Sequence, residues 1–234
     1  MPSPGVFLWR GIIAQVAVLV DGSFFLKRYV YTYGRNHSPE KTANDLFTMC
    51  LKHLEGKYND TLYRILFYDC PPFEGKPNNP ITGKAIDFSK TDLYTFRVKF
   101  YQELLKKRKI ALRRGRLVSA GGWIIKPDPM KELLHRTKAI SDLTENDVRY
   151  DLRQKGVDMR MGLDIASIAY KRLANKIILV TGDADFVPAA KLARREGIDV
   201  VLDPMWQPVS RDLFEHTDGL HSTCPQPLAS TKRT

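Results

Sequence analysis

The sequence contains little cysteine and little histidine, which argues against two common kinds of site. Its three cysteines, Cys50, Cys70 and Cys224, are widely spaced, so they fit neither a disulfide framework nor a Cys-x-x-Cys zinc pair. The five histidines include no close pair with the spacing of metal ligands on a helix. We therefore expect buried thiols, ordinary core or surface histidines, and no zinc chemistry.

The chain also lacks a long apolar run. No segment approaches the ~18 uninterrupted apolar residues of a membrane span, and the apolar N-terminal stretch is interrupted by Arg10 and Gln15. That stretch runs directly into Asp21-Gly22-Ser23, which looks like the end of a strand rather than a signal-peptide cleavage site. We therefore expect a cytoplasmic protein with no membrane partner. The sequence leaves a homo-oligomer open.

Acidic residues are outnumbered by basic ones. The chain has 37 Lys and Arg residues against 26 Asp and Glu residues, and its net charge is +11. Such an excess favours a polyanionic partner, because each neutralised phosphate releases condensed counterions. The basic residues are densest at Lys106–Lys109 and Arg113–Arg116. If these segments stood alone, a solvated helix face would be the preferred interpretation.

Apolar runs and helical spacing predict the fold class. Strands are predicted over Val16–Val20, Leu62–Tyr68, Ile177–Thr181 and Asp199–Leu202, and helices over Thr42–Glu55, Phe88–Lys109, Ile165–Ala174 and Phe186–Glu196. Short Val-, Ile- and Leu-rich strands separated by helices predict an α/β protein with a mostly parallel central sheet that is covered on both faces.

The domain organisation is expected to be simple. We predict a single domain over residues 1–221, with a basic insertion around residues 84–150. An inserted hairpin is expected from residues 111–118 and 123–125, across Gly121-Gly122. Residues 222–234 contain prolines and small polar residues, and we expect them to form a disordered tail.

Aspartates follow two of the predicted strands. Asp21 ends the first apolar run, and Asp183 and Asp185 follow the run Ile177–Thr181. The carboxyl ends of parallel strands open on one edge of the sheet, where α/β folds place their chemistry, so these side chains should meet. Taken alone, Asp21 is better explained as a turn or N-cap residue. Asp185 can cap the next helix, which leaves Asp183 unexplained by capping.

Two further aspartates, Asp158 and Asp164, precede or begin a predicted helix. On one continuous helix they would lie about 120° apart and could not share a face. If Gly162 breaks the chain, Asp164 lies in the first helical turn and points at the strand ends, while Asp158 approaches from the preceding loop. The alternative is that both acids only balance the helix dipole, which explains Asp164 better than Asp158.

A cluster of carboxylates favours a particular chemistry. Such a cluster is costly unless a divalent cation neutralises it, and ligation by oxygen alone suits Mg²⁺ or Mn²⁺. These ions activate and orient water at phosphorus and stabilise the leaving oxygen. Together with the basic surface, the cluster predicts hydrolysis of phosphodiester bonds by a divalent-metal-dependent nuclease.

These motifs resemble the NYN-domain family, the PIN-like nucleases that include many bacterial LabA-like proteins. The matching pieces are Val20–Ser23, Tyr68–Pro72, Lys155–Asp158 with Asp164, and Thr181–Phe186. The resemblance implies a Rossmann-like α/β/α sandwich and metal-dependent cleavage of RNA, which we expect to be single-stranded. It implies that Asp21, Asp164 and Asp183 bind the metal, with Asp158 and Asp185 as supporting catalytic acids.

One position departs from the family pattern. Many members have asparagine three residues after the first aspartate, where this chain has Phe24. Ser23 is then a candidate contact to the site in its place. The departure leaves open an alternative function, a catalytically weak or inactive RNA-binding module of the same fold.

Three basic residues are candidates for substrate binding. Lys155 adjoins the acids and is a candidate phosphate contact, with an ordinary solvated lysine as the alternative. Arg114 and Arg116 are candidates for contacts with the substrate backbone, with a salt bridge to acidic residues in the 142–151 segment as the alternative. A small-molecule phosphohydrolase is a further hypothesis, but that class carries Asp-x-Asp at its first strand, where this chain has Asp21-Gly22-Ser23.

Overall fold

The computed structural model describes residues 14–54 and 60–227. At its centre is a six-stranded sheet in the order β3-β2-β1-β6-β7-β8, in which every neighbouring pair is parallel. The strands are β1 (Gln15–Asp21), β2 (Thr61–Asp69), β3 (Ile110–Arg114), β6 (Lys176–Val180), β7 (Asp199–Asp203) and β8 (Gly219–Leu220). The predicted strands are confirmed, and the parallel sheet brings their carboxyl ends to one edge.

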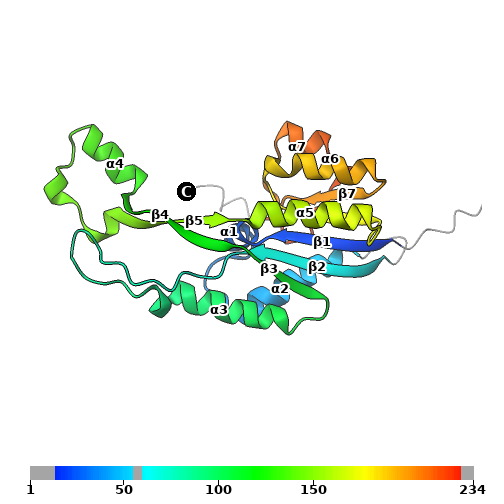
Figure 1. Ribbon diagram of the computed structural model, residues 1–234, viewed down its shortest axis with the longest axis horizontal. Coiled ribbons are helices and arrows are strands. Elements are labelled where there is room, and N and C mark those ends of the chain that lie inside the picture. Colours follow the sequence, from blue (N-terminus) through cyan, green and yellow to red (C-terminus); the bar gives the residue numbers. More distant parts are fainter. Residues whose placement is uncertain (1–13, 55–59, 228–234) are drawn as a thin grey trace, which may run out of the picture.

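Helices cover both faces of this sheet (Figure 1). One face carries α1 (Gly22–Tyr33), α2 (Pro39–Lys52) and α3 (Asp92–Leu105), and the other carries α5 (Val157–Tyr170), α6 (Val187–Arg195) and the short α7 (Arg211–Glu215). Because successive strand residues point to opposite faces, Val16, Val18 and Val20 enter one core while Ala17 and Leu19 enter the other. The predicted α/β/α sandwich is confirmed.

The inserted hairpin differs from the prediction. The predicted strand 111–118 is divided between two sheets. Its first residues belong to β3 of the parallel sheet, where Ala111 and Leu112 pair with Leu66 and Phe67 of β2, and its last residues, 116–118, begin β4 (Arg116–Ile125). The antiparallel pair consists of β4 and β5 (Val148–Lys155). Gly121-Gly122 does not form the turn; both glycines have positive φ and lie where the register of the β4–β5 pair shifts.

Between β4 and β5 the chain forms α4 (Pro127–Leu134) and two 3₁₀ turns at Ile140–Asp142 and Glu145–Asp147. The strand pair and α4 project from the sandwich as an arm (Figure 1). The root of this arm, where β5 returns to the sandwich and leads into α5, lies beside the carboxyl edge of the sheet.

The packed part of the chain continues past the predicted boundary at residue 221. Cys224 is buried in the core beside α2, and the Thr223 hydroxyl donates a hydrogen bond of 2.9 Å to the carbonyl of Met49. The remainder of the predicted tail, 228–234, lies outside the described residues. Cys50, Cys70 and Cys224 are buried free thiols, as predicted. Within the described residues, no helix combines the length and apolar character needed to cross a bilayer.

Candidate active site

Four neighbouring strands lead into aspartates at the carboxyl edge of the sheet. In sheet order they are Asp69 at the end of β2, Asp21 at the end of β1, Asp183 shortly after β6 and Asp203 at the end of β7. The sequence pattern therefore places four carboxyl groups along one edge. Their partners decide which of them are available for chemistry.

Two of these acids are neutralised inside the protein. Asp69 is buried, forms an ion pair with Arg97 and accepts a 2.8 Å hydrogen bond from the Tyr101 hydroxyl. Asp203 is fully buried, and one of its oxygens lies 2.9 Å from Nε2 of His53. A buried carboxylate with a matched cation or imidazole is most simply explained as a structural group. Asp21 and Asp183 remain.

The remaining acids converge on a hollow of about 660 Å³, which we call the acidic pocket. Its walls come from the ends of β1, β6 and β7, the first turns of α1 and α5, and the root of the arm. It is lined by Asp21, Ser23, Phe24, Lys27, Gln154, Asp158, Gly182, Asp183 and Gln207. The predicted meeting of Asp21 and Asp183 at one edge of the sheet is confirmed.

Asp21 both caps a helix and faces the acidic pocket. Its Oδ1 accepts a hydrogen bond of 3.1 Å from the amide of Phe24 and so caps α1. Burial raises the pKa of the Asp21 carboxyl to about 6; the Phe24 amide opposes this shift, and the negative charges of Asp158 and Asp69 add to it. The cap uses one carboxylate oxygen, so the other is available to a ligand.

Asp183 has the same double role. Its Oδ1 accepts a hydrogen bond of 2.9 Å from the amide of Asp185 and caps the 3₁₀ turn Ala184–Phe186. The prediction that Asp185 is the cap is therefore wrong, because the turn begins at Ala184, two residues before the predicted helix start at Phe186. The Asp185 side chain is exposed and does not line the acidic pocket, although its charge raises the pKa of Asp158.

Asp158, and not Asp164, is the third acid of the pocket. Helix α5 starts at Val157 and runs through Gly162 without a break, so the expected helix start at Asp164 is wrong. Asp158 lies in the first turn and lines the acidic pocket. Burial, and then the charges of Asp183 and Asp185, raise its pKa.

Asp164 lies on a different side of α5, as the helix period requires for residues six apart. Its carboxylate accepts a 2.8 Å hydrogen bond from the Tyr68 hydroxyl and forms an ion pair of 2.9 Å with Nε of Arg113. It does not line the acidic pocket. Arg113 and Tyr68 thus give Asp164 a local structural role.

The predicted substrate-binding residues are divided by the structure. Ser23 lines the acidic pocket, and its hydroxyl accepts a 2.9 Å hydrogen bond from Nε2 of Gln154. Lys155, Arg114 and Arg116 are exposed and do not line this pocket. The Arg114 guanidinium instead lies 5.7 Å from the centre of the Tyr101 ring.

The alternative for the two arginines, a salt bridge to the 142–151 segment, is also not found among the described residues. In that segment Asp147 pairs with Lys138 and Asp151 pairs with Arg153. Arg114 and Arg116 are therefore left on the surface beside the root of the arm, where a polyanion can reach them.

Three pocket residues were not predicted. Lys27 lies one turn after Ser23 on α1, a helix that was not predicted from the sequence.

Gln207 lies shortly after the carboxyl end of β7. Asp183 was selected because it follows the carboxyl end of a strand, and the same reasoning would have pointed to the segment that contains Gln207. The Gln207 side chain packs closely against Gly182, just after β6. A Cβ atom added to Gly182 would lie only 2.7 Å from Nε2 of Gln207 and 2.8 Å from the Phe24 ring. Gln154 comes from the arm and had no sequence signal.

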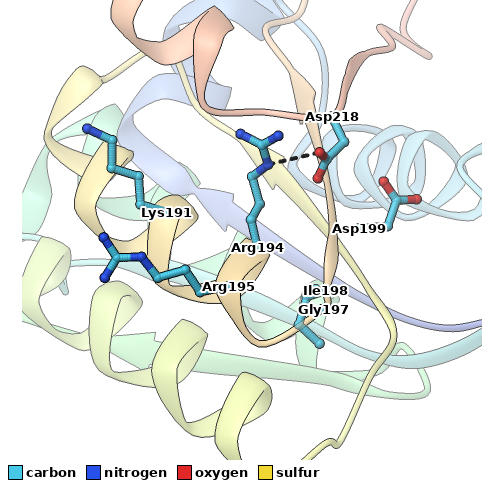
Figure 2. A pocket seen from close by; sticks show the side chains of 7 residues that line it. All are labelled: Lys191, Arg194, Arg195, Gly197, Ile198, Asp199 and Asp218. Atoms are coloured by element: carbon cyan, nitrogen blue, oxygen red, sulfur yellow. Dashed lines mark hydrogen bonds and ion pairs between the residues drawn. The ribbon is translucent and has the colours of Figure 1, made fainter.

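A second hollow, of about 670 Å³, lies at the opposite edge of the sheet, where β7 begins (Figure 2). It is lined by Lys191, Arg194, Arg195, Gly197, Ile198, Asp199 and Asp218. Arg194 is held by Asp218, whose Oδ1 lies 2.8 Å from its Nε (Figure 2). Basic and acidic side chains both line this second hollow and partly neutralise one another. Of these two hollows, only the one at the carboxyl edge brings together carboxylates that have no ion-pair partner among the described residues.

The donors of the acidic pocket fit a hard divalent cation. Asp21, Asp158 and Asp183 have no ion-pair partner within residues 14–54 and 60–227, and burial and mutual repulsion raise the pKa of both Asp21 and Asp158. Among those residues no group of three or more acids, histidines or cysteines is close enough to hold an ion together. Mg²⁺ does not need three protein ligands, because it binds through one or two carboxylates and completes its shell with water and phosphate oxygens.

Asp21→Asn should stabilise the cation-free protein near neutral pH. The folded pKa of Asp21 is raised, so the cost of its ionised form appears as the pH rises from about 4 through about 6. Asparagine keeps the N-cap but carries no charge. Urea unfolding near pH 7 should therefore give about 1–3 kcal/mol of added stability, and the gain should disappear below about pH 4. An equal gain at both pH values would show that the ionised Asp21 carboxylate does not destabilise the folded protein.

No curated protein matches the chain. A crystal structure of a protein of unknown function from Vibrio parahaemolyticus is similar, with 15% identity, a TM-score of 0.44, and coverage of 88% of this chain and 91% of that chain.

A family model described as NYN domain matches residues 86–222, more than half of the chain. The matched part includes Asp158, Asp164 and Asp183 and begins after Asp21. The parallel sheet with helices on both faces is the PIN-like α/β/α architecture expected for such a domain. On its fold and on this match, the chain belongs to the NYN-domain family.

Proposed function

We propose that this protein is a divalent-metal-dependent endoribonuclease that hydrolyses single-stranded RNA at the acidic pocket. The observation that carries the proposal is the convergence of Asp21, Asp158 and Asp183, which have no ion-pair partner among the described residues, at the carboxyl edge of the sheet. Asp69 and Asp203, the other strand-end carboxylates at this edge, are instead engaged by Arg97 and His53. Family membership and the net charge of +11 support a polyanionic substrate.

Each residue of the pocket has a role in this proposal. Two of the three acids Asp21, Asp158 and Asp183 would hold Mg²⁺ or Mn²⁺, and Asp21 and Asp183 each keep one carboxylate oxygen that their caps do not use. When bound, such an ion activates water and neutralises charge on the phosphodiester. Lys27 stands at the rim of the pocket, where it attracts the phosphate, and the hydrogen bond from Gln154 orients the Ser23 hydroxyl toward the same space.

Asp164 has a positioning role in this account. Its ion pair with Arg113 ties α5 to β3, and its hydrogen bond with Tyr68 ties α5 to β2. Asp185 contributes negative charge near Asp158 without facing the pocket. Lys155, Arg114 and Arg116 remain candidates for contacts with more distant phosphates of a bound strand. The cytoplasmic location stays a prediction.

Cleavage of a labelled single-stranded RNA tests the proposal. The wild-type protein should cut in Mg²⁺ or Mn²⁺ and be inactive in chelator, and Asp183→Asn should remove at least roughly 99% of the rate. Asparagine preserves the cap on the Ala184–Phe186 turn, so an unchanged unfolding midpoint would exclude misfolding as the cause. Intact RNA across several metals and substrates would contradict the proposal.

Phe24 favours the alternative outcome, a module that binds RNA and turns it over weakly or not at all. Its ring lines the acidic pocket where many family members have asparagine, so one polar contact to the substrate or cation shell is missing. Binding that weakens with salt, survives removal of metal and is followed by no cleavage would identify this function.

A further inference from the structure

A cleft of about 620 Å³ adjoins the acidic pocket. It is lined by Pro204, Trp206, Gln207, Pro208, Val209, Phe214, Leu220, His221 and Ser222, and we call it the aromatic cleft. Gln207 lines both the aromatic cleft and the acidic pocket. A ligand chain leaving the acidic pocket past Gln207 therefore enters the aromatic cleft directly.

Large apolar side chains in the lining of the aromatic cleft are exposed to solvent. Trp206 is 44% exposed, Phe214 58% and Leu220 43%, although each has a large apolar side chain. Scattered exposed apolar residues are ordinary, but several that line one concave surface next to a candidate active site mark a binding surface. None of the described residues that line this cleft is acidic, so they do not repel a polyanion.

Hydrogen bonds fix the position of Trp206, although part of its side chain is exposed to solvent. Its indole N–H donates a 2.9 Å hydrogen bond to the carbonyl of Cys224, and its amide donates one of 3.1 Å to the Ser222 hydroxyl. Arg28 donates to the carbonyl of the preceding Met205 at 2.6 Å. These bonds fix the orientation of the indole before any ligand arrives.

The backbone at this point is strained. Met205 has φ 45° and Trp206 has φ 63°, a left-handed conformation that is uncommon for residues with a Cβ. Asp203 stabilises the turn by accepting a 2.8 Å hydrogen bond from the amide of Met205. Such strain persists only where surrounding contacts enforce it, and it concentrates at ligand clamps. Here it directs an indole into the cleft and Gln207 toward the acids.

We propose that the aromatic cleft binds a base of the RNA strand whose phosphodiester occupies the acidic pocket, and that this base stacks on Trp206. The inference rests on the proposed function and adds a base-binding subsite to it. Stacking on aromatic rings is how proteins hold unpaired bases, and it tolerates any base. The Gln207 amide, between the two sites, is placed to contact the sugar or phosphate that joins them.

Tryptophan fluorescence of the full chain in chelator tests the inference without requiring cleavage. A short single-stranded oligouridine should quench the emission, and a strand of equal length with abasic positions should quench it much less. Trp206→Phe should remove the quenching component. Trp206→Ala should weaken oligouridine binding by about 5- to 100-fold.

Two further variants separate stacking from folding. Phe214→Ala removes a second aromatic ring from the lining of the cleft without removing a hydrogen bond of Trp206, and it should also weaken binding. Tyr170→Ala removes a comparably exposed aromatic side chain, 63% exposed, from the far end of α5 and should leave binding unchanged.

Equal binding of oligouridine and the abasic strand, with no change in Trp206 emission, would overturn the base-binding cleft. The same would follow if a proline-rich peptide, and not RNA, quenched Trp206. Either result could accompany normal RNA cleavage, in which case the proposed nuclease function would stand. The cleavage assay tests the proposed nuclease function separately.

Discussion

Asp158→Asn is expected to lower the rate of RNA cleavage by at least about 100-fold, whereas Asp164→Asn should leave the rate within about threefold of the wild-type value. Asp158 lines the acidic pocket, and its pKa is raised by burial and by the charges of Asp183 and Asp185. Asp164 is instead engaged by Tyr68 and Arg113. Only the first substitution removes a charge that a cation would neutralise.

The comparison is well matched, because both variants exchange one carboxylate for an amide on the same helix. The ion pair of Asp164 is partly exposed, with 46% of the Arg113 side chain accessible, so its loss should cost no more than about 1 kcal/mol. Single-turnover cleavage and urea unfolding of both variants provide the measurement. If Asp164→Asn were the inactive variant and Asp158→Asn the active one, the metal set implied by the family resemblance would be correct and the pocket assignment wrong.

Asp203→Ala should lower the free energy of unfolding by about 3–5 kcal/mol. The side chains of Asp203 and His53 are 0% and 1% exposed, so removal of the carboxylate leaves a buried imidazole without its partner. It also removes the acceptor for the amide of Met205 in the strained turn. Urea or thermal unfolding measures the loss, which is large against a typical total stability of about 5–15 kcal/mol.

Asp212→Ala is the natural control for this prediction. Asp212 and His216 also form an Asp–His contact, at 3.5 Å, but 63% of the Asp212 side chain is accessible. Its removal should change the free energy of unfolding by less than about 1 kcal/mol. Similar losses for the two variants would mean that Asp203 and His53 are not a buried structural pair, and the distinction between neutralised and available strand-end acids would fail.

The parts of the fold that local patterning controls were predictable. The apolar runs around Val18, Leu66, Leu179 and Val200 are strands because both faces of the sheet are buried, so no alternation with polar residues is needed. Parallel order then brings Asp21 and Asp183 to one edge. Two members of the acidic pocket therefore followed from the sequence.

The third acid of the pocket, Asp158, was predicted only in a supporting role, because the sequence does not show whether Gly162 interrupts the helix. A glycine costs a helix only about 1 kcal/mol relative to alanine. Here α5 continues through it because Val157, Met161, Ile165 and Ile168 form one buried stripe on the core. Because this stripe packs on the core, the helix begins at Val157. Asp158 then lies in the first turn and lines the acidic pocket, whereas Asp164 does not.

Other features of the site depend on long-range contacts. Gln154 reaches the pocket only because β5 pairs with β4 and returns the arm to the sheet, a pairing that the Gly121-Gly122 pattern concealed. The orientation of Trp206 and Gln207 depends on backbone strain that is enforced from Arg28, Asp203 and Ser222. Arg28 and Ser222 are far from the turn in sequence, so local propensity gives no sign of these two contacts.

The most direct test of the account is the position of Mn²⁺ in crystals of the wild-type protein, located by its anomalous scattering. We expect an ion in the acidic pocket, bound by carboxylate oxygens of at least two of Asp21, Asp158 and Asp183, with Asp164 still paired to Arg113. An ion held by Asp164, or no ion in this pocket at saturating Mn²⁺, would contradict it.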